Sequence, residues 1–174
     1  MRGNRSRDTA PEKLLRKHLH ERGARYRVSH RPIAGVRRTA DIAFPGARVA
    51  VFVDGCFWHG CPLHCRWPGT NEEFWRDKIE GNRARDSETN RLLEQSGWLP
   101  VRVWEHEDSS EAADKIIALV KVRRRVTASE KRASQVTVHQ KFGDGVLSAP
   151  QHDATVARAI SEQTATASKA GLRQ

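Results

Sequence analysis

The sequence predicts an α/β domain in which a mixed sheet is flanked by helices, and this domain occupies residues 1–125 of the 174. Three observations support this prediction. The chain opens with an amphipathic helical segment, two short apolar segments rich in β-formers follow it, and a further strand then lies between two helical stretches. Helices and strands that alternate in this way typically pack as a sheet covered by helices.

The first helix is predicted from its end signals. Thr9 is suited to be the N-cap, Pro11 lies in the first turn and Glu12 follows the cap by three residues, the spacing of a capping box. Gly23 is suited to end the helix. The leucines of this segment give it an apolar face.

Two strands are predicted next, in "TADIAF" (39–44) and "RVAVFV" (48–53), with a turn at Pro45-Gly46 between them. The second segment is almost wholly apolar, as expected for a central strand that is covered on both faces. Together the two segments predict a hairpin.

The next elements are a long helix in 71–97, a strand in 98–104 and a last helix in 109–125. Gly81 is expected to interrupt the first of these helices. Pro100 cannot donate a ladder hydrogen bond, so the start of the strand is expected at a sheet edge. Ser109 or Ser110 is expected to cap the last helix.

Residues 126–174 are predicted to be a low-complexity, flexible C-terminal tail, because they are rich in Ala, Ser, Thr and Gln and contain one aromatic residue, Phe142. A small hairpin around Asp144-Gly145 is the local exception.

The formal net charge is +10, of which +8 falls within residues 1–125. A basic surface favours a polyanionic partner such as nucleic acid, although a well-solvated surface is the simpler explanation. No apolar segment reaches the length of a membrane span or a signal peptide, so a soluble, cytoplasmic protein is expected. A reducing cytosol would keep the three cysteines as thiols.

All three cysteines lie within "VDGCFWHGCPLHC" (53–65), together with two histidines. Thiolates and imidazoles are the ligands of structural zinc, which prefers four of them in a tetrahedron. A short loop seldom encloses an ion alone, and His106, at the end of the strand 98–104, is placed to supply a remote ligand. The alternative is that the cysteines are small buried residues and the histidines lie on the surface.

Acidic residues predict a second metal site. Asp41 lies in the first hairpin strand and Val53-Asp54 ends the second, so a carboxylate and a backbone carbonyl are expected to lie close together, as Mg²⁺ prefers. From spacing alone, a surface carboxylate beside the turn is the better interpretation of Asp41, and the case for Glu12 as a capping residue without a catalytic role is stronger still. His59 is the loop histidine that the zinc does not obviously need, and it is either a general base or a surface residue.

Five segments, taken in order from about residue 4 to residue 107, resemble the very short patch repair (Vsr) DNA mismatch endonucleases: "RDTAPEKLLRKHLHERGARYRV", "TADIAF", "VFVDGCFWHGCPLHC", "NEEFWRDKIEGNRARD" and "GWLPVRVWEHE". The resemblance implies a fold of the restriction-endonuclease type, one structural Zn²⁺ and a Mg²⁺-dependent site. It also implies nicking 5′ of the thymine in a T·G mismatch, in a cell that has a cytosine-5 DNA methyltransferase.

The resemblance also implies roles for individual residues. Asp41 matches the metal-binding aspartate, Val53 the residue whose carbonyl binds Mg²⁺, His59 the histidine that activates water, and Glu12 a glutamate near the water shell of the metal. The aromatic residues that match those inserted into the duplex are Phe57, Trp58 and Trp75. Such wedges unstack a base step, and a mismatched step costs less to open. The alternative for Trp58 and Trp75 is ordinary core packing.

The chain departs from the family pattern at three places. At the end of the second strand, this chain has Val53 and Asp54 where the best-known member of the family has threonine and histidine. The carboxylate of Asp54 could bind the catalytic metal directly. The zinc loop is one residue longer, so the third ligand beside Cys56 and Cys61 is His64 or Cys65, with His64 preferred. His106 takes the place of a cysteine as the remote ligand, which zinc accepts.

The expected partner is double-stranded DNA carrying a T·G mismatch, bound by a monomer associated with the nucleoid, with a functional link to the methyltransferase and to repair proteins. Two other classes of protein remain open. One is a related nuclease that acts in defence or restriction, and the other is a zinc-stabilised DNA-binding module without catalysis.

Overall fold

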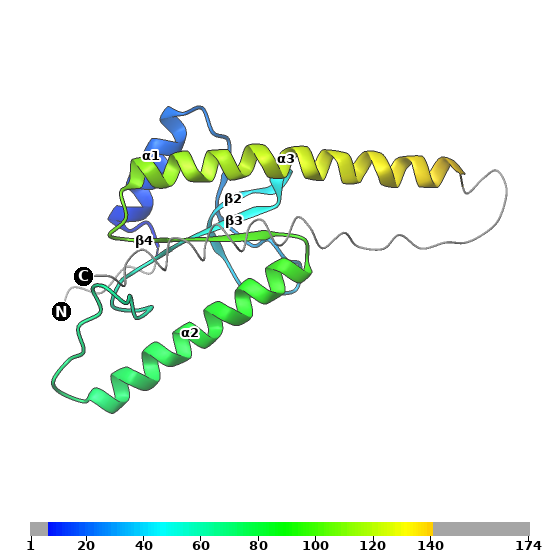
Figure 1. The fold of residues 1–174 in the computed structure, drawn as a ribbon. Helices are drawn as coiled ribbons and strands as arrows, with labels where there is room; N and C mark the ends of the chain where they lie inside the picture. Colours follow the sequence, from blue (N-terminus) through cyan, green and yellow to red (C-terminus); the bar gives the residue numbers. More distant parts are fainter. Residues whose placement is uncertain (1–6, 141–174) are drawn as a thin grey trace, which may run out of the picture. The chain divides into compact units, whose positions relative to one another are not determined.

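The computed structural model describes residues 7–140. Its elements, in chain order, are α1 (Ala10–Glu21), β1 (Arg27–His30), β2 (Ala40–Phe44), the 3₁₀ turn η1 (Pro45–Ala47), β3 (Val49–Asp54), α2 (Glu72–Gln95), β4 (Leu99–Trp104) and α3 (Ser109–Gln140) (Figure 1). The predicted mixed α/β fold is confirmed. None of the helices within residues 7–140 is long and apolar enough to span a membrane.

The sheet has the strand order β1-β2-β3-β4. The first two pairings are antiparallel and the β3–β4 pairing is parallel. β3 is therefore a central strand and β4, which carries Pro100, lies at an edge, as the sequence predicts. β1 is not predicted from the sequence, because "RVSH" has no apolar run and its side chains are exposed or half-buried.

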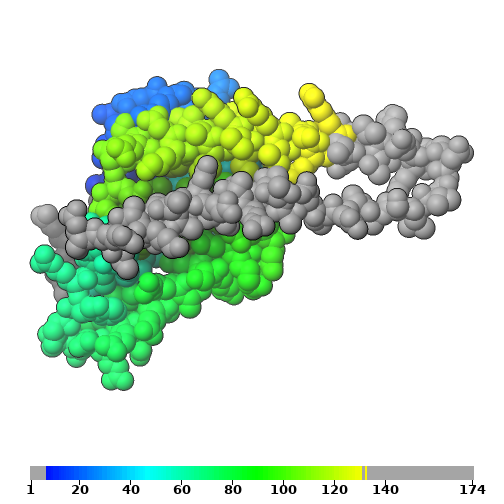
Figure 2. Space-filling model, in the orientation of Figure 1, coloured from blue at the N-terminus to red at the C-terminus, as the bar shows by residue number. Residues whose placement is uncertain are grey.

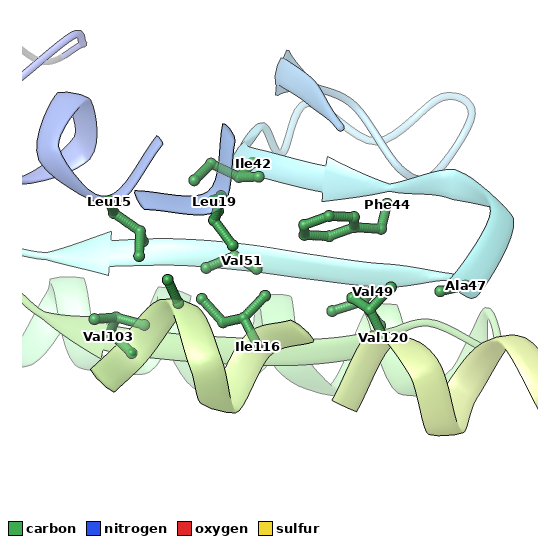
Figure 3. Packing of buried hydrophobic residues seen from close by; sticks show 12 residues of the cluster. Leu15, Leu19, Ile42, Phe44, Ala47, Val49, Val51, Val103, Ile116 and Val120 are labelled. Atoms are coloured by element: carbon green, nitrogen blue, oxygen red, sulfur yellow. The ribbon is translucent and has the colours of Figure 1, made fainter. Parts of the chain in front are cut away.

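Helices cover the two faces of the sheet unequally. α1 and α3 lie on one face, where Leu15, Leu19 and Ile116 pack with the strand residues of a twelve-residue buried core (Figures 1 and 3). α2 lies on the other face, where the buried cluster consists of Ala40, Ala50 and Leu93. The space-filling view shows the same two layers, with α1 and α3 above and the green α2 below (Figure 2).

The ends of α1 follow the prediction. The Thr9 hydroxyl accepts a hydrogen bond from the Glu12 amide at 3.4 Å, and Gly23 follows the helix with φ +71°. A positive φ strains any residue that has a side chain, so glycine suits this position.

Two predicted helix features are wrong. α2 is continuous through Gly81, because the contacts of the helix offset the cost of about 1 kcal/mol that one interior glycine imposes. α3 is capped by Asp108, whose Oδ1 accepts hydrogen bonds from the amides of Ser110 and Glu111 at 2.9 and 2.8 Å. Neither Ser109 nor Ser110 caps it.

α3 continues past residue 125 to Gln140. Thr127 is buried, and its hydroxyl donates to the Gly46 carbonyl at 3.3 Å, so the helix still packs on the domain at Thr127. The first arm of the hairpin predicted around Asp144-Gly145 belongs to α3. The rest of that hairpin and the remainder of the predicted tail lie outside the described residues.

Candidate active site and metal centre

The parallel pairing of β3 and β4 brings two distant loops together. Asp54 is the register partner of Trp104, and the Glu105 amide donates to the Asp54 carbonyl at 2.9 Å. The Cys56 amide then donates to Glu105 Oε1 at 2.6 Å. Because both strands run in the same direction, the loops that follow them leave the same edge of the sheet. Cys56 and His106 therefore meet, although 50 residues separate them.

Cys56, Cys61, His64 and His106 form one cluster, in which one ligand atom from each residue lies within 4.8 Å of the others. Nδ1 of His106 lies 3.1 Å from Sγ of Cys56 and 3.7 Å from Sγ of Cys61, and Nδ1 of His64 lies 3.8 Å from Sγ of Cys61. Ligands at zinc distances in a tetrahedron are about 3.3–3.8 Å apart. The donor set therefore suits one Zn²⁺, and most of these separations are close to those that the ion requires.

Cys65 is not part of this cluster. Its Sγ contacts the Phe57 carbonyl oxygen at 4.0 Å. Within residues 7–140, the cluster that could hold a metal ion contains His64 and not Cys65, which supports the preference for His64.

A cavity of about 870 Å³ lies beside this cluster. It is lined by the starts of α1 and β2, the end of β3 and the loop after it, and residues of α2 and β4. Glu12, Asp41, Asp54 and His59 all line it, so the structure brings the four predicted catalytic residues together. Asp86 of α2 and Arg102 of β4 line it too, and neither was foreseen.

Asp41 is a half-buried carboxylate at the start of β2. The Val53 amide donates to its Oδ2 at 2.8 Å, which confirms that the two strand ends adjoin. Burial raises the pKa of Asp41 to about 6, and the charges of Glu12 and Asp54 add to this rise. A cation at this carboxylate would relieve both effects, so the residue fits a divalent metal ion.

Glu12 could cap α1, and it could also act near the catalytic metal. It is buried, and its carboxylate accepts hydrogen bonds from the Asp8 amide and the Thr9 hydroxyl, both at 2.9 Å, which ties down the start of α1. The same carboxylate faces the cavity and acts electrostatically on Asp41. Its capping function is therefore confirmed, and a function near the metal stays a prediction.

His59 is oriented by Asp86. Its Nδ1 lies 2.5 Å from Asp86 Oδ2, and since an ionised carboxylate only accepts hydrogen bonds, Nδ1 carries the proton. Nε2 of the neutral ring is then left with a lone pair, as a general base requires. The hydrogen bond that His59 donates to Asp86 raises the pKa of His59, against the effect of burial.

Asp54 is engaged by an arginine. It is buried, and both of its carboxylate oxygens lie 2.8 Å from Nη1 of Arg102. Nη2 of the same guanidinium lies 3.0 Å from Asp86 Oδ1. Asp54, which the sequence leaves open as a direct metal ligand, is in an ion pair with Arg102 in this structure.

The three predicted DNA-wedging residues form an aromatic cluster. The ring centroids of Phe57 and Trp58 are 5.2 Å apart, those of Phe57 and Trp75 are 5.3 Å apart and those of Trp58 and Trp75 are 6.1 Å apart. Phe74, which was not foreseen, lies 5.2 Å from Trp75 and is 60 % exposed. All three predicted residues are only partly buried, unlike Ile79, so the cluster is not a closed core.

Gly60 lets α2 approach the zinc loop. It has φ +63°, and a Cβ at this position would lie 2.8 Å from Cγ2 of the buried Ile79. Only glycine fits both the backbone conformation and the space.

The positions of Asp86 and Arg102, which were not predicted, could have been recognised in the sequence. Asp86 lies seven residues from both Ile79 and Leu93, on the inward face of α2, where a charge is unusual. Arg102 interrupts an apolar strand between Val101 and Val103. A charged residue at such a position needs a partner.

Comparisons with known proteins identify the family of the chain. Residues 1–66 match the profile of the family described as DNA mismatch endonuclease Vsr. The type II nicking enzyme V.NaeI of Lentzea aerocolonigenes is 44 % identical over 119 residues, which cover 67 % of this chain and 72 % of that protein. The chain belongs to the Vsr family. V.XorIIP of Xanthomonas oryzae pv. oryzae, also a type II nicking enzyme, is 42 % identical over 105 residues (59 % of this chain, 74 % of that protein).

The DNA mismatch endonuclease Vsr of Escherichia coli is 37 % identical over 108 residues, which cover 60 % of this chain and 66 % of that protein. This Vsr-family chain is accordingly a nuclease, and its mixed sheet with flanking helices is the restriction-endonuclease-like fold that the resemblance implied.

Proposed function

We propose that this Vsr-family protein is a Mg²⁺-dependent endonuclease that nicks one strand of duplex DNA, 5′ of the thymine in a T·G mismatch. The observation that carries the proposal is that Asp41 and the His59–Asp86 pair line one cavity at the edge of the sheet. The names of the relatives, which are nicking enzymes and a mismatch endonuclease, support it.

Asp41 and the Val53 carbonyl would hold the magnesium ion. When bound, Mg²⁺ supplies charge that stabilises the phosphate oxygens as the phosphodiester is cleaved. Glu12, which is held by the start of α1, faces the same cavity and would orient water near that ion.

His59 would take the proton of the attacking water at Nε2, while Asp86 holds the ring through Nδ1. A positioned base of this kind contributes roughly 10²- to 10⁴-fold in rate. The oxygen that leaves is the 3′ oxygen of the preceding nucleotide, so the product is a nick with a 5′ phosphate on the thymidine.

The aromatic residues Phe57, Trp58 and Trp75 would insert beside the mismatch, where the stacked pairs are weakest. The basic surface would hold the phosphates. Zn²⁺ on Cys56, Cys61, His64 and His106 would fix the loop that carries Phe57, Trp58 and His59. Its role would be structural, because protein ligands fill all four positions.

The proposal extends to the setting of the enzyme. We place it in the cytoplasm, as a monomer on nucleoid DNA, in a cell that has a cytosine-5 methyltransferase whose deaminated product it repairs. A nuclease that restricts foreign DNA and a DNA-binding module without catalysis remain the alternatives.

A nicking assay with Mg²⁺ on matched and T·G duplexes of the same sequence separates these three functions. We expect nicking of the thymine strand of the T·G duplex only, and no product from Asp41→Asn, which should still bind that duplex. Cutting of both duplexes would favour the restriction function, and binding without cutting would favour the binding module.

A further inference from the structure

Arg102 lies at the centre of a polar network that joins the sheet to α2. It is the register partner of Phe52 on β3, and its guanidinium lies 5.0 Å from the centroid of the Phe52 ring. Side chains two residues apart on a strand share a face, so Asp54 lies on the same face as Phe52 and Arg102. This is the face that α2 covers.

Each nitrogen of the guanidinium has a partner. Nη1 contacts both oxygens of Asp54, Nη2 contacts Asp86 Oδ1 at 3.0 Å, and Nε lies 3.3 Å from Asn90 Oδ1. The planar fork of arginine can hold two carboxylates in a fixed relation, which the ammonium of lysine cannot do.

The two carboxylate oxygens of Asp86 contact two different residues. Oδ1 contacts Arg102 and Oδ2 contacts Nδ1 of His59. The rotation of the Asp86 carboxylate is therefore set by Arg102, and the orientation of the imidazole is set by that rotation.

We propose that Arg102 is a positioning residue for the nicking reaction: it anchors Asp86 to the sheet and thereby aims His59 into the cavity. This inference rests on the proposed function. It assigns the Asp54–Arg102 pair to alignment of the base and leaves Asp41 as the carboxylate for the catalytic metal.

The first test is Arg102→Met, with the exposed Arg91→Met on the same side of the domain as the matched control. Single-turnover nicking of the T·G duplex should fall by about 100-fold in Arg102→Met, as for misplacement of a catalytic group by about 1 Å, while the Kd for the duplex stays the same. Arg91→Met should retain the rate. An unchanged rate in Arg102→Met would overturn the proposal.

Two double variants separate positioning from simple stabilisation. Asp54→Asn with Arg102→Met removes the buried unpaired charge, so Tm should recover towards that of the wild type while the rate stays low. His59→Ala with Arg102→Met should be no slower than His59→Ala alone, because Arg102 acts through His59. Recovery of the rate together with Tm, or a further 100-fold loss in the His59→Ala background, would each show that the proposal is wrong.

A spectroscopic measurement keeps the inference separate from the proposed function. If the wild-type protein nicks neither duplex, the proposed function fails, and the orientation of His59 can still be read from the NMR signal of its Nδ1 proton. We expect this signal in the wild type and in Arg91→Met, and its loss or broadening in Arg102→Met. The same signal in all three proteins would overturn the anchoring role.

Discussion

The sheet is covered on one face by α1 and α3 and on the other by α2, and different chemistry holds the two layers. Twelve buried residues form the core under α1 and α3 (Figure 3), and three form the cluster under α2. On the α2 face, the ion pairs of Arg102 and the His59–Asp86 hydrogen bond take the place of apolar contact. The difference separates stability from chemistry, because the apolar face can hold the fold while the polar face keeps charged groups in reach of a ligand.

The largest effect is expected in the zinc loop (residues 56–65), at the edge of the polar face, which is the face of the sheet that α2 covers. Cys61→Ala should lose the metal and lower the free energy of unfolding by several kcal/mol, since formation of a structural zinc site is coupled to folding. Nicking should be lost as well, because the loop carries His59. Metal analysis and thermal unfolding check this prediction.

Cys65→Ala is the matched control for Cys61→Ala, because the Cys65 thiol lies outside the ligand cluster. It should retain zinc and Tm. Full zinc content in Cys61→Ala, or loss of zinc in Cys65→Ala only, would exclude the ligand set.

The second effect concerns the chemistry of the polar face. His59→Ala should reduce single-turnover nicking by roughly 10²- to 10⁴-fold, with zinc content and Tm unchanged, because His59 is bound to Asp86 and not to the metal cluster. His20→Ala, an exposed histidine of α1, serves as the control. A variant that loses zinc but nicks at the normal rate would reassign His59 to the metal.

On the face covered by α1 and α3, a substitution should lower the stability of the protein and leave the nicking rate unchanged. Ile116→Ala removes a fully buried side chain of α3 and should cost about 2–5 kcal/mol of the free energy of unfolding, measured by urea denaturation. At temperatures well below Tm its nicking rate should match that of the wild type. The exposed Lys115→Ala should change neither quantity, and a large rate loss in Ile116→Ala would mean that the two faces are not separable.

The smallest effect is expected from the C-terminal segment. Removal of residues 141–174 should leave the nicking rate within about twofold, because the described groups of the cavity all precede them. Truncation after Arg125 should in addition lower the free energy of unfolding by about 1 kcal/mol, because the Thr127–Gly46 hydrogen bond is lost. A nicking assay on both truncated proteins decides whether the segment contributes to catalysis.

Local signals in the sequence were sufficient for most of the fold. The Thr9 cap, the apolar segment of β3 and Pro100 at the edge strand act within a few residues of their position, so they can be recognised without a structure. β1 could not be recognised, since "RVSH" becomes a strand only by pairing with β2. The continuity of α2 through Gly81 likewise depends on long-range contacts.

For the candidate site, the residue types indicated which residues take part. The sequence did not indicate which of these residues contact one another. Cysteines and histidines at close spacing predicted the cluster at Cys56, and the carboxylate of Asp41 near the end of the next strand predicted a second metal site. The partners of Asp54 and His59 lie 48 and 27 residues away along the chain, on β4 and α2. Only the parallel β3–β4 pairing and the packing of α2 bring them together.

Gly60 has a consequence for how such proteins can vary. It lies between His59, the proposed base, and Cys61, a proposed metal ligand, where the loop contacts Ile79 of α2. An added methyl group would push the helix and the loop apart and would shift both centres together. A substitution at Gly60 is therefore expected to disturb the proposed base and the proposed metal site at the same time.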